Sequence, residues 1–265
     1  IYPDVISGTS AGSIAGALYA AGVDIYGFAK SIADEEVWKL IDPTFTPGYI
    51  LNFLFYYWSK RPMTMWAIPE GLIKGNKIEQ YFDKVLGGKC FNELKVPLYV
   101  VSVDINTGET VVFCSKNIVP GNKPHNTLFI TDSSVSAAVR ASISLPGIFV
   151  PKKIKGHRLV DGGIKNNVPI DVLYSLGAKK IIAVDLGKTS ERPKAGSLVE
   201  ILMASVDIMG DELSYYINKN YPAHFIYPDV KGIGYKDFRK IPEIVKHGEE
   251  VANKVLPAIK KFLGY

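Results

Sequence analysis

The sequence has little cysteine, no long hydrophobic run and no repeated or low-complexity segment. Cys90 and Cys114 are the two cysteines among 265 residues, so neither a disulfide framework nor a C-x-x-C metal motif is predicted, and a reducing compartment is favoured. The most apolar window, residues 49–58, spans ten residues, whereas a membrane-spanning helix needs about 20. No transmembrane segment is therefore expected. With no linker or repeat to divide the chain, we expect one domain over residues 1–265.

Charge of one sign is not concentrated anywhere in the chain. The 31 Lys and Arg residues exceed the 26 Asp and Glu residues, which gives a formal net charge of +5, and the basic residues are spread along the sequence. This excess favours anionic surfaces such as acidic phospholipid headgroups or nucleic acid, but it forms no basic arm and by itself identifies no partner. We expect no nucleic-acid partner, and a cytoplasmic or peripheral membrane location with secretion left open.

The hydrophobic pattern predicts strands that alternate with helices. Strands are expected at 5–7, 97–105, 109–114, 158–161, 179–187 and 224–230, and helices at 11–21, 25–40, 76–86, 133–145, 168–176, 197–219 and 241–263. Asn76 is the expected N-cap of its helix. This alternation predicts a mainly parallel sheet covered by helices on both faces, with residues 191–265 as a helical C-terminal part.

One short stretch, GTSAGS at residues 8–13, has the Gly-x-Ser-x-Gly spacing of a nucleophile elbow. In such an elbow, small neighbours let the backbone turn sharply from a strand into a helix and leave the hydroxyl exposed. Gly8, Ser10 and Gly12 have that spacing. The helix that begins here also directs its free amides toward a developing oxyanion, and the N–H of Ala11 is the nearest.

Two other interpretations of this stretch are a chance match to the motif and a phosphate-binding loop. Three fixed letters arise by chance in roughly one chain of this size in ten. Phosphate-binding loops are also rich in glycine, but neither G-x-G-x-x-G nor G-x-x-x-x-G-K-[ST] fits here. The preceding strand and the small residues Ala15, Gly16 and Ala20, which permit close packing of helix on sheet, favour the elbow.

A nucleophilic serine needs a base, and Asp161 is a stronger candidate for it than any of the histidines. It ends a short apolar run, and Gly162 and Gly163 then release the backbone into a turn, which places the carboxylate at a strand end. By itself Asp-Gly-Gly is more often an ordinary Asx turn. Histidine is the usual base in catalysis, and the chain has four such residues, His125, His157, His224 and His247.

Three blocks together resemble the patatin-like phospholipases. They are GTSAGS with Ser10, ASISLPGIF at 141–149 and DGGIKNNVP at 161–169, in the family's order, and the resemblance runs from residue 1 to about 190. It implies a three-layer α/β/α sandwich, a Ser-Asp dyad and hydrolysis of acyl esters in lipids. It also implies chemistry that needs no metal or cofactor.

The resemblance assigns roles at matching positions. Ser10 matches the nucleophile and Asp161 its partner in the dyad. Arg140 and residues 142–146 match a block that packs under the site, and the asparagines at 166–167 fall in the turn after the dyad, where their amides brace the loop. In the family, a glycine-rich oxyanion loop with a basic residue precedes the elbow. No such stretch precedes residue 1, so we expect that strand and loop to be absent here.

The resemblance leads to a mechanism and a lipid contact. Without the upstream loop, Ala11 is the remaining expected oxyanion donor, and losing one donor costs about 10²- to 10³-fold in rate. An aspartate with a pKa near 4 is a poor base, so Asp161 must be partly buried to raise its pKa. The stretch 51–66 combines aromatic residues with Lys60 and Arg61, and it is either a core segment or a patch that contacts the membrane surface.

Two other functions remain open from the sequence. Acyl-carrier transacylases and Ser-His esterases also use Gly-x-Ser-x-Gly elbows, but they require a histidine base. A lipid-binding protein that keeps the fold without catalysis is the third alternative. The identity of the lipid and the ester bond that is cleaved depend on the shape of the pocket, which the sequence does not give.

Overall fold

The computed structural model describes residues 1–34, 37–45, 58, 69–121, 123–187, 196–229 and 238–265. The predicted aromatic stretch 51–66 therefore lies outside the described residues, except for Trp58, which is exposed. Within the described part of the chain, no helix has the length and apolar character needed to cross a membrane.

A six-stranded sheet forms the middle layer, with β3 (Leu98–Asp104) at its centre. All residues of β3 are buried, as its continuous apolar run predicts for a central strand. The other five strands are β1 (Ile6–Thr9), β4 (Thr110–Phe113), β5 (Thr127–Ile130), β7 (Lys152–Ile154) and β8 (His157–Asp161).

The strand directions in this sheet are mixed, where the sequence led us to expect mainly parallel pairing. β1 is parallel to β3 and β5 to β4, but β4 and β8 are antiparallel to β3, and β7 is antiparallel to β8. Two of the antiparallel pairs, β3 with β4 and β7 with β8, follow from the length of their connections. Residues 105–109 join β3 to β4 and residues 155–156 join β7 to β8, and such short turns can only link antiparallel neighbours.

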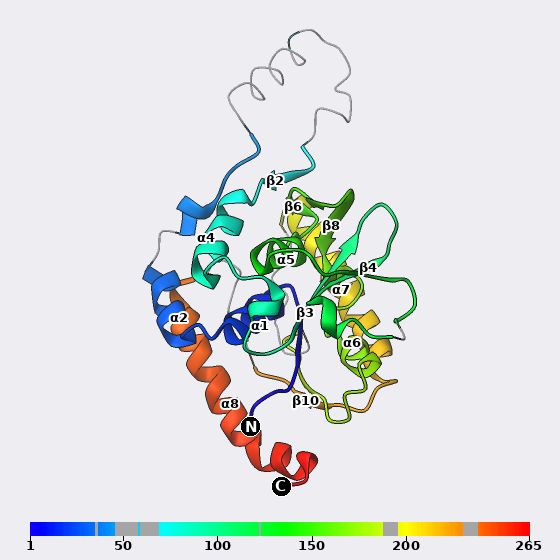
Figure 1. Cartoon of the computed structure of the whole chain (residues 1–265). Coiled ribbons are helices and arrows are strands. Elements are labelled where there is room, and N and C mark those ends of the chain that lie inside the picture. The colour runs from blue at the N-terminus through cyan, green and yellow to red at the C-terminus, as the bar shows by residue number, and fades with distance from the viewer. Residues whose placement is uncertain (35–36, 46–57, 59–68, 122, 188–195, 230–237) are drawn as a thin grey trace.

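Helices cover both faces of the sheet, which confirms the α/β/α sandwich (Figure 1). Leu98 and Val100 of β3 pack with α1 (Ala11–Ala21), α4 (Asn76–Leu86) and α5 (Val135–Ser142). The alternate residues Tyr99 and Val101 face the other side, where they pack with Val172 of α6 (Ile170–Ser175). The long helix α7 (Leu198–Asn218) lies on the same side as α6.

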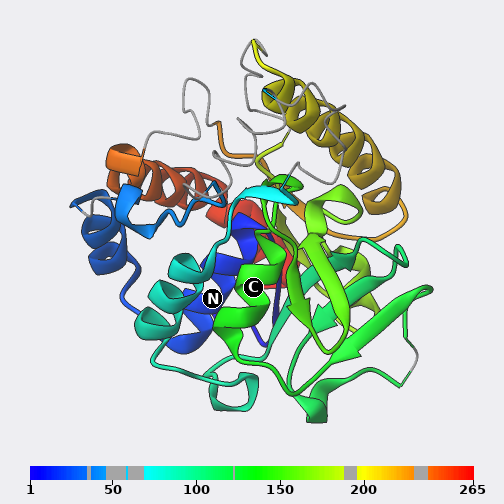
Figure 2. The ribbon, with the colours of Figure 1, turned by 90° about the horizontal axis from the view of Figure 1, so that it is seen from above.

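Two small parallel pairs and two further helices complete the described structure. β2 (Gly71–Ile73) pairs with β6 (Gly147–Phe149), and β9 (Ile182–Val184) pairs with β10 (His224–Ile226). The helix α2 (Ile25–Asp34) packs beside α8 (Ile241–Leu263), as Figure 2 shows. The phenol of Tyr26 donates a hydrogen bond of 2.5 Å to Glu249 across this contact.

The turn between β1 and α1 gives a matched pair of glycine substitutions. A Cβ atom at Gly8 would lie 2.4 Å from the carbonyl oxygen of Gly12, whereas one at Gly12 would have nothing within 4 Å. We predict that Gly8→Ala lowers the free energy of unfolding by about 1–3 kcal/mol, as overpacking does. Gly12→Ala should leave it unchanged or raise it by up to about 1 kcal/mol, because alanine favours helix. Urea unfolding measures both, and equal stabilities would contradict this turn geometry.

Candidate active site

Two strand ends meet on one edge of β3. β1 runs parallel to β3 and ends with Thr9 opposite Val101. β8 runs antiparallel to β3 and ends with Asp161 opposite Ser102, the next position along. Because β4 occupies the other edge of β3, the carboxyl ends of β1 and β8 face each other. Ser10 follows Thr9 directly, so the register of the sheet brings the predicted serine and aspartate together.

Ser10 occupies a strained turn. Its φ is 52° and its ψ is −124°, a positive φ that few residues other than glycine adopt. Its backbone N–H donates to Ser142 Oγ (2.9 Å), and its carbonyl accepts from the N–H and the hydroxyl of Ser13 (2.9 and 2.6 Å). These contacts fix the backbone on both sides of the side chain, as a nucleophile elbow requires.

The start of α1 presents amide donors beside Ser10. Ala11 and Gly12 are exposed, and within the described part of the chain neither backbone N–H donates a hydrogen bond. The first turn of α1 carries no acidic side chain. Free amides at a helix N-terminus bind anions, so this end of α1 suits an oxyanion. The amide of Gly12 is a second free donor beside the predicted Ala11, and it could have been expected because every helix leaves several amides free at its first turn.

Asp161 is almost fully buried, with 1% of its surface exposed. Its backbone N–H donates to the carbonyl of Ser144 (2.9 Å), and its Oδ1 accepts from the N–H of Gly163 (2.8 Å). The second carboxylate oxygen, Oδ2, has no hydrogen-bond partner of ordinary length among the described residues. One oxygen is thus held by the loop while the other is left available.

The surroundings of Asp161 shift its acidity toward neutral pH. Burial raises the pKa of the carboxyl from 3.8 to about 6, because a charged carboxylate is poorly solvated there. The hydroxyl of Ser10 and the amide of Gly163 act in the opposite direction, since they interact favourably with the charged form, and the charge of Asp207 adds to the rise.

Close packing explains both glycines after Asp161. A Cβ atom at Gly162 would lie 2.6 Å from the carbonyl oxygen of Val101, so only glycine lets this turn lie against β3. A Cβ atom at Gly163 would lie 3.1 Å from Oδ1 of Asp161. The helix α7 covers the same loop, since a Cβ atom at its Gly210 would lie 2.8 Å from the carbonyl oxygen of Gly163.

The block that ends α5 supports both site residues. Ser142 Oγ accepts from the N–H of Ser10 and donates to the carbonyl of Val101 (2.6 Å). Two residues later, Ser144 accepts the N–H of Asp161 and donates from its own hydroxyl to the carbonyl of Arg140 (2.7 Å). The supporting role assigned to this block thus has a geometric basis: one serine holds the backbone of each site residue.

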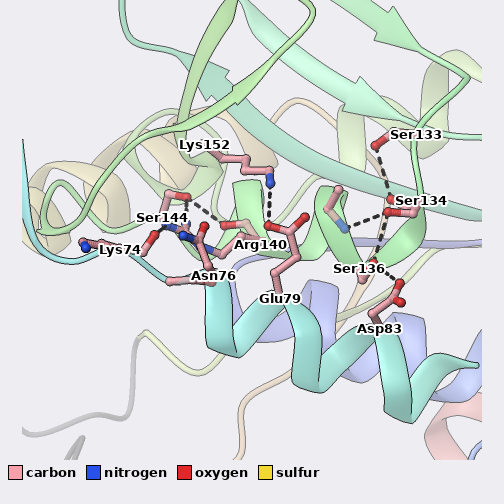
Figure 3. Close-up of polar contacts among 12 residues, drawn as sticks. Lys74, Asn76, Glu79, Asp83, Ser133, Ser134, Ser136, Arg140, Ser144 and Lys152 are labelled. Carbon is pink, nitrogen blue, oxygen red and sulfur yellow. Dashed lines mark hydrogen bonds and ion pairs between the residues drawn. The ribbon is translucent and has the colours of Figure 1, made fainter. Parts of the chain in front are cut away.

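Arg140 connects this block to two other segments (Figure 3). Its side chain is 1% exposed and donates to the carbonyls of Gly75 (3.0 Å), Lys74 (2.6 Å) and Val150 (2.9 Å), and to the hydroxyl of Ser144. Burial lowers the pKa of the guanidinium. A buried cation that is satisfied by carbonyl groups is a rigid anchor, because each donor would be costly to leave unpaired.

The loop after Asp161 is fastened to β1. The hydroxyl of Thr9 donates to the carbonyl of Asn166 (2.8 Å), and Ser7 Oγ donates to the carbonyl of Pro169 (3.1 Å). Asn166 is buried, and its side-chain amide donates to Asp171 (2.6 Å). Asn167 lies near Gly163, with its Oδ1 3.3 Å from where a Cβ atom of that glycine would be. Asn166 therefore braces the loop as the sequence analysis expected.

The four histidines lie in other contacts. His157 bonds to Asp104 (2.7 Å) at the opposite end of β8 from Asp161, and the ring of His224 packs on Phe262. His247 lies in α8, and its buried Nε2 has no hydrogen-bond partner among the described residues. His125 contributes its carbonyl to a loop contact. No hydrogen bond found among the described residues joins a histidine to Ser10 or Asp161, so this geometry gives no support for a Ser-His pair.

The described residues contain no group of three or more His, Cys, Asp or Glu side chains placed to hold a metal ion. Cys114 is buried and Cys90 is exposed, and both are free thiols. Burial raises the pKa of the Cys114 thiol to about 12, which leaves it unreactive at neutral pH.

Comparison with known proteins gives several relatives. An uncharacterized NTE family protein of Mycobacterium tuberculosis is 25% identical over 190 residues, 71% of this chain and 42% of the relative. The uncharacterized protein YqhO of Bacillus subtilis is 28% identical over 247 residues, 88% of this chain and 79% of the relative. Patatin-like phospholipase domain-containing protein 7 of Rattus norvegicus is 28% identical over 190 residues, 71% of this chain and 12% of that protein.

The chain thus spans less than half the length of the mycobacterial relatives that it matches. A family model described as patatin-like phospholipase matches residues 1–174, more than half of the chain. That range includes all three sequence blocks and both strand ends of the site. This chain belongs to the patatin-like phospholipase family.

Proposed function

We propose that this protein is a lipid acyl hydrolase of the phospholipase A type, with Ser10 as nucleophile and Asp161 as base. Membership of the patatin-like phospholipase family supports a lipid hydrolase. The observation that supports the residue assignment is the meeting of β1 and β8 on one edge of β3, since Ser10 follows the end of β1 and the buried Asp161 ends β8. The substrate is a phospholipid or another lipid with a fatty acyl ester.

In the first step, Ser10 Oγ attacks the carbonyl carbon of the ester while its proton passes to Oδ2 of Asp161. The carbonyl oxygen becomes an oxyanion, which the amides of Ala11 and Gly12 stabilise at the N-terminus of α1. The bond to the alcohol then breaks, and Asp161 returns the proton to the leaving oxygen. The products are the free alcohol, such as a lysophospholipid, and an acyl ester on Ser10.

In the second step, water attacks the acyl ester and Asp161 takes a proton from that water. The bond to Ser10 breaks, the fatty acid leaves, and the proton returns to Ser10 Oγ, so the site is restored. A base works best when its pKa lies near the working pH. The pKa of about 6 at Asp161 leaves the carboxyl ionised at pH 7 yet far more basic than an exposed aspartate.

Access of lipid to this site is also part of the proposal. Contact with a membrane surface through residues 51–66 is proposed on the sequence alone, since that stretch lies outside the described residues except for Trp58. The aromatic side chains would lie at headgroup depth, and Lys60 and Arg61 would contact phosphate groups.

Covalent labelling tests the proposed nucleophile. We expect a fluorophosphonate to add one adduct to the wild-type protein and none to Ser10→Ala, as measured by intact mass.

Asp161→Asn should reduce the hydrolysis of a phospholipid by at least about 10³-fold, because the general base is lost. For the same reason, kcat/KM of the wild type should rise with pH through about 6, where Asp161 becomes ionised.

Two matched variants control for unspecific effects. Ser205→Ala removes an exposed hydroxyl of α7, and Asp132→Asn removes an exposed carboxylate that pairs with Lys155. Both should label and hydrolyse as the wild type does. Turnover by Asp161→Asn at near-normal rate would refute the dyad, and an adduct that persists in Ser10→Ala would refute the nucleophile. Loss of activity on replacing a histidine at unchanged fold would favour a Ser-His enzyme.

Because of Asp161, the free energy of unfolding should fall with rising pH over the range in which activity rises. Its pKa is higher in the folded protein than the ordinary 3.8, so the folded state retains the proton to higher pH, and the free energy of unfolding falls between about pH 4 and pH 6. The loss amounts to about 3 kcal/mol. Asn carries no charge, so Asp161→Asn should match the wild type at pH 4 and exceed its stability at pH 7.5. Urea unfolding at both pH values checks this, and a destabilised variant at pH 7.5 would contradict it.

A further inference from the structure

The long helix α7 carries a continuous apolar face on its outer side. Figure 2 shows α7 at the outer edge of the molecule. Its inner side is buried at Gly210, Ser214 and Asn218, which lie on successive turns. Five large apolar side chains on the outer side are between 38% and 66% exposed: Ile201, Ile208, Met209, Leu213 and Tyr216. At about 100° per residue, these five fall within an arc of about 140° that is centred almost opposite the buried side.

The size of this face approaches that of a protein interface. A large side chain covers about 200 Å² when it is fully exposed, so the five side chains together expose on the order of 500 Å² of apolar surface. The largest apolar patch of a soluble monomer measures about 300–600 Å² and often serves a function. A standard interface buries about 800 Å² on each partner. The apolar face of α7 would therefore supply more than half of such an interface.

The charge of α7 argues against a membrane or a nucleic acid as the partner of this face. The helix sequence contains no Lys or Arg and has four acidic residues, Glu200, Asp207, Asp211 and Glu212. Helices that lie on a membrane place Lys and Arg beside the apolar face, where these residues contact anionic headgroups. Nucleic acids likewise require basic residues that neutralise their phosphates. A protein surface is therefore the partner that fits α7.

Two polar residues within the same arc make this face complementary to itself. Ser205 lies three positions before Ile208, and Glu212 lies three positions after Met209. In an antiparallel pair of α7 helices with a two-fold axis at this point, Ser205 of one copy faces Glu212 of the other. The Ser205 hydroxyl donates to the carbonyl of Ile201 in the single chain (2.8 Å), and rotation of the side chain redirects it to the carboxylate. A parallel pair would instead place the two Glu212 carboxylates together, and like charges repel.

We propose that this face of α7 binds a second copy of the chain and that the protein is a symmetric homodimer. The two α7 helices pack antiparallel, with Ile208 and Met209 at the two-fold axis and with Ser205 paired to Glu212 on either side of it. The interface is isologous, because both copies use the same face. Gly210, which packs on the loop after the proposed base, lies on the other side of α7. The dimer therefore does not depend on the proposed hydrolase.

Sedimentation equilibrium of the full chain measures the dissociation constant of the dimer, and an aspartate at the centre of the face tests the interface. Ile208→Asp should raise this constant at least about 100-fold, because two carboxylates then meet at the two-fold axis. Ile105 is the matched control, since it is 48% exposed, as Ile208 is, but lies in the turn between β3 and β4. Ile105→Asp should change the constant less than about twofold.

A charge at Ser205 tests the antiparallel register. Ser205→Lys places a cation opposite Glu212 and should tighten the dimer at least about threefold at low salt. Ser205→Glu places like charges together and should weaken the dimer at least about tenfold. The same two changes at Asn253, an exposed residue of α8, alter the net charge equally, and each should change the constant less than about twofold.

A wild-type chain that sediments as a monomer at every concentration would overturn the proposal, as would a dimer that Ile208→Asp leaves intact. Equal effects of Ser205→Lys and Ser205→Glu would refute the antiparallel register and with it the proposed interface. Binding of a monomer to vesicles of phosphatidylcholine and phosphatidylglycerol, lost in Ile208→Asp and kept in Ile105→Asp, would assign the face to a membrane instead. None of these measurements depends on turnover, so a failure of the proposed hydrolase would leave them unchanged.

Discussion

The arrangement of the site depends on one constraint, the shared edge of β3. β4 pairs along the opposite edge, so β1 and β8 must divide this one between them, and they approach from opposite directions until their carboxyl ends meet. A one-residue slip of β8 would turn the side chain of Asp161 to the other face of the sheet. The approach of Ser10 to Asp161 is therefore a property of strand register, and the loops add precision to it.

That precision comes from hydrogen bonds that hold strained or buried groups. The positive φ of Ser10 is compensated by Ser142 and Ser13, and the backbone of Asp161 is held by Ser144. Arg140 ties this block to the segments at Lys74 and Val150 (Figure 3). Placing a carboxylate in such a site costs stability at neutral pH, and the same burial raises its pKa into the range of a useful base.

The sequence predicted the elements that local patterns encode. The G-x-S-x-G elbow, the turn after Asp161 and the limits of α1, α5, α7 and α8 were close to those observed, because glycines and helical periodicity mark them directly. Features that depend on distant segments were missed. Asn76 was predicted to cap α4, but the cap position is Gly75, and the carboxylate of Asp42 accepts from the amides of Gly75 and Asn76 (2.6 and 2.9 Å). Antiparallel pairing in the main sheet was missed, because the alternation of strands and helices along the chain favours parallel pairing, whereas the strands β3 and β4 follow each other through a short turn with no helix between them.

The proposed mechanism requires that the hydroxyl of Ser10 contacts the buried carboxyl of Asp161, and the pKa of that carboxyl reports this contact most directly. Carbon-13 NMR of labelled aspartate can follow the titration of Asp161 in the wild type and in Ser10→Ala, with Asp161→Asn to assign the signal. The structure predicts a pKa near 6 in the wild type and a higher value in Ser10→Ala, because the hydroxyl stabilises the charged form. A pKa near 4, or one that Ser10→Ala leaves unchanged, would contradict this account.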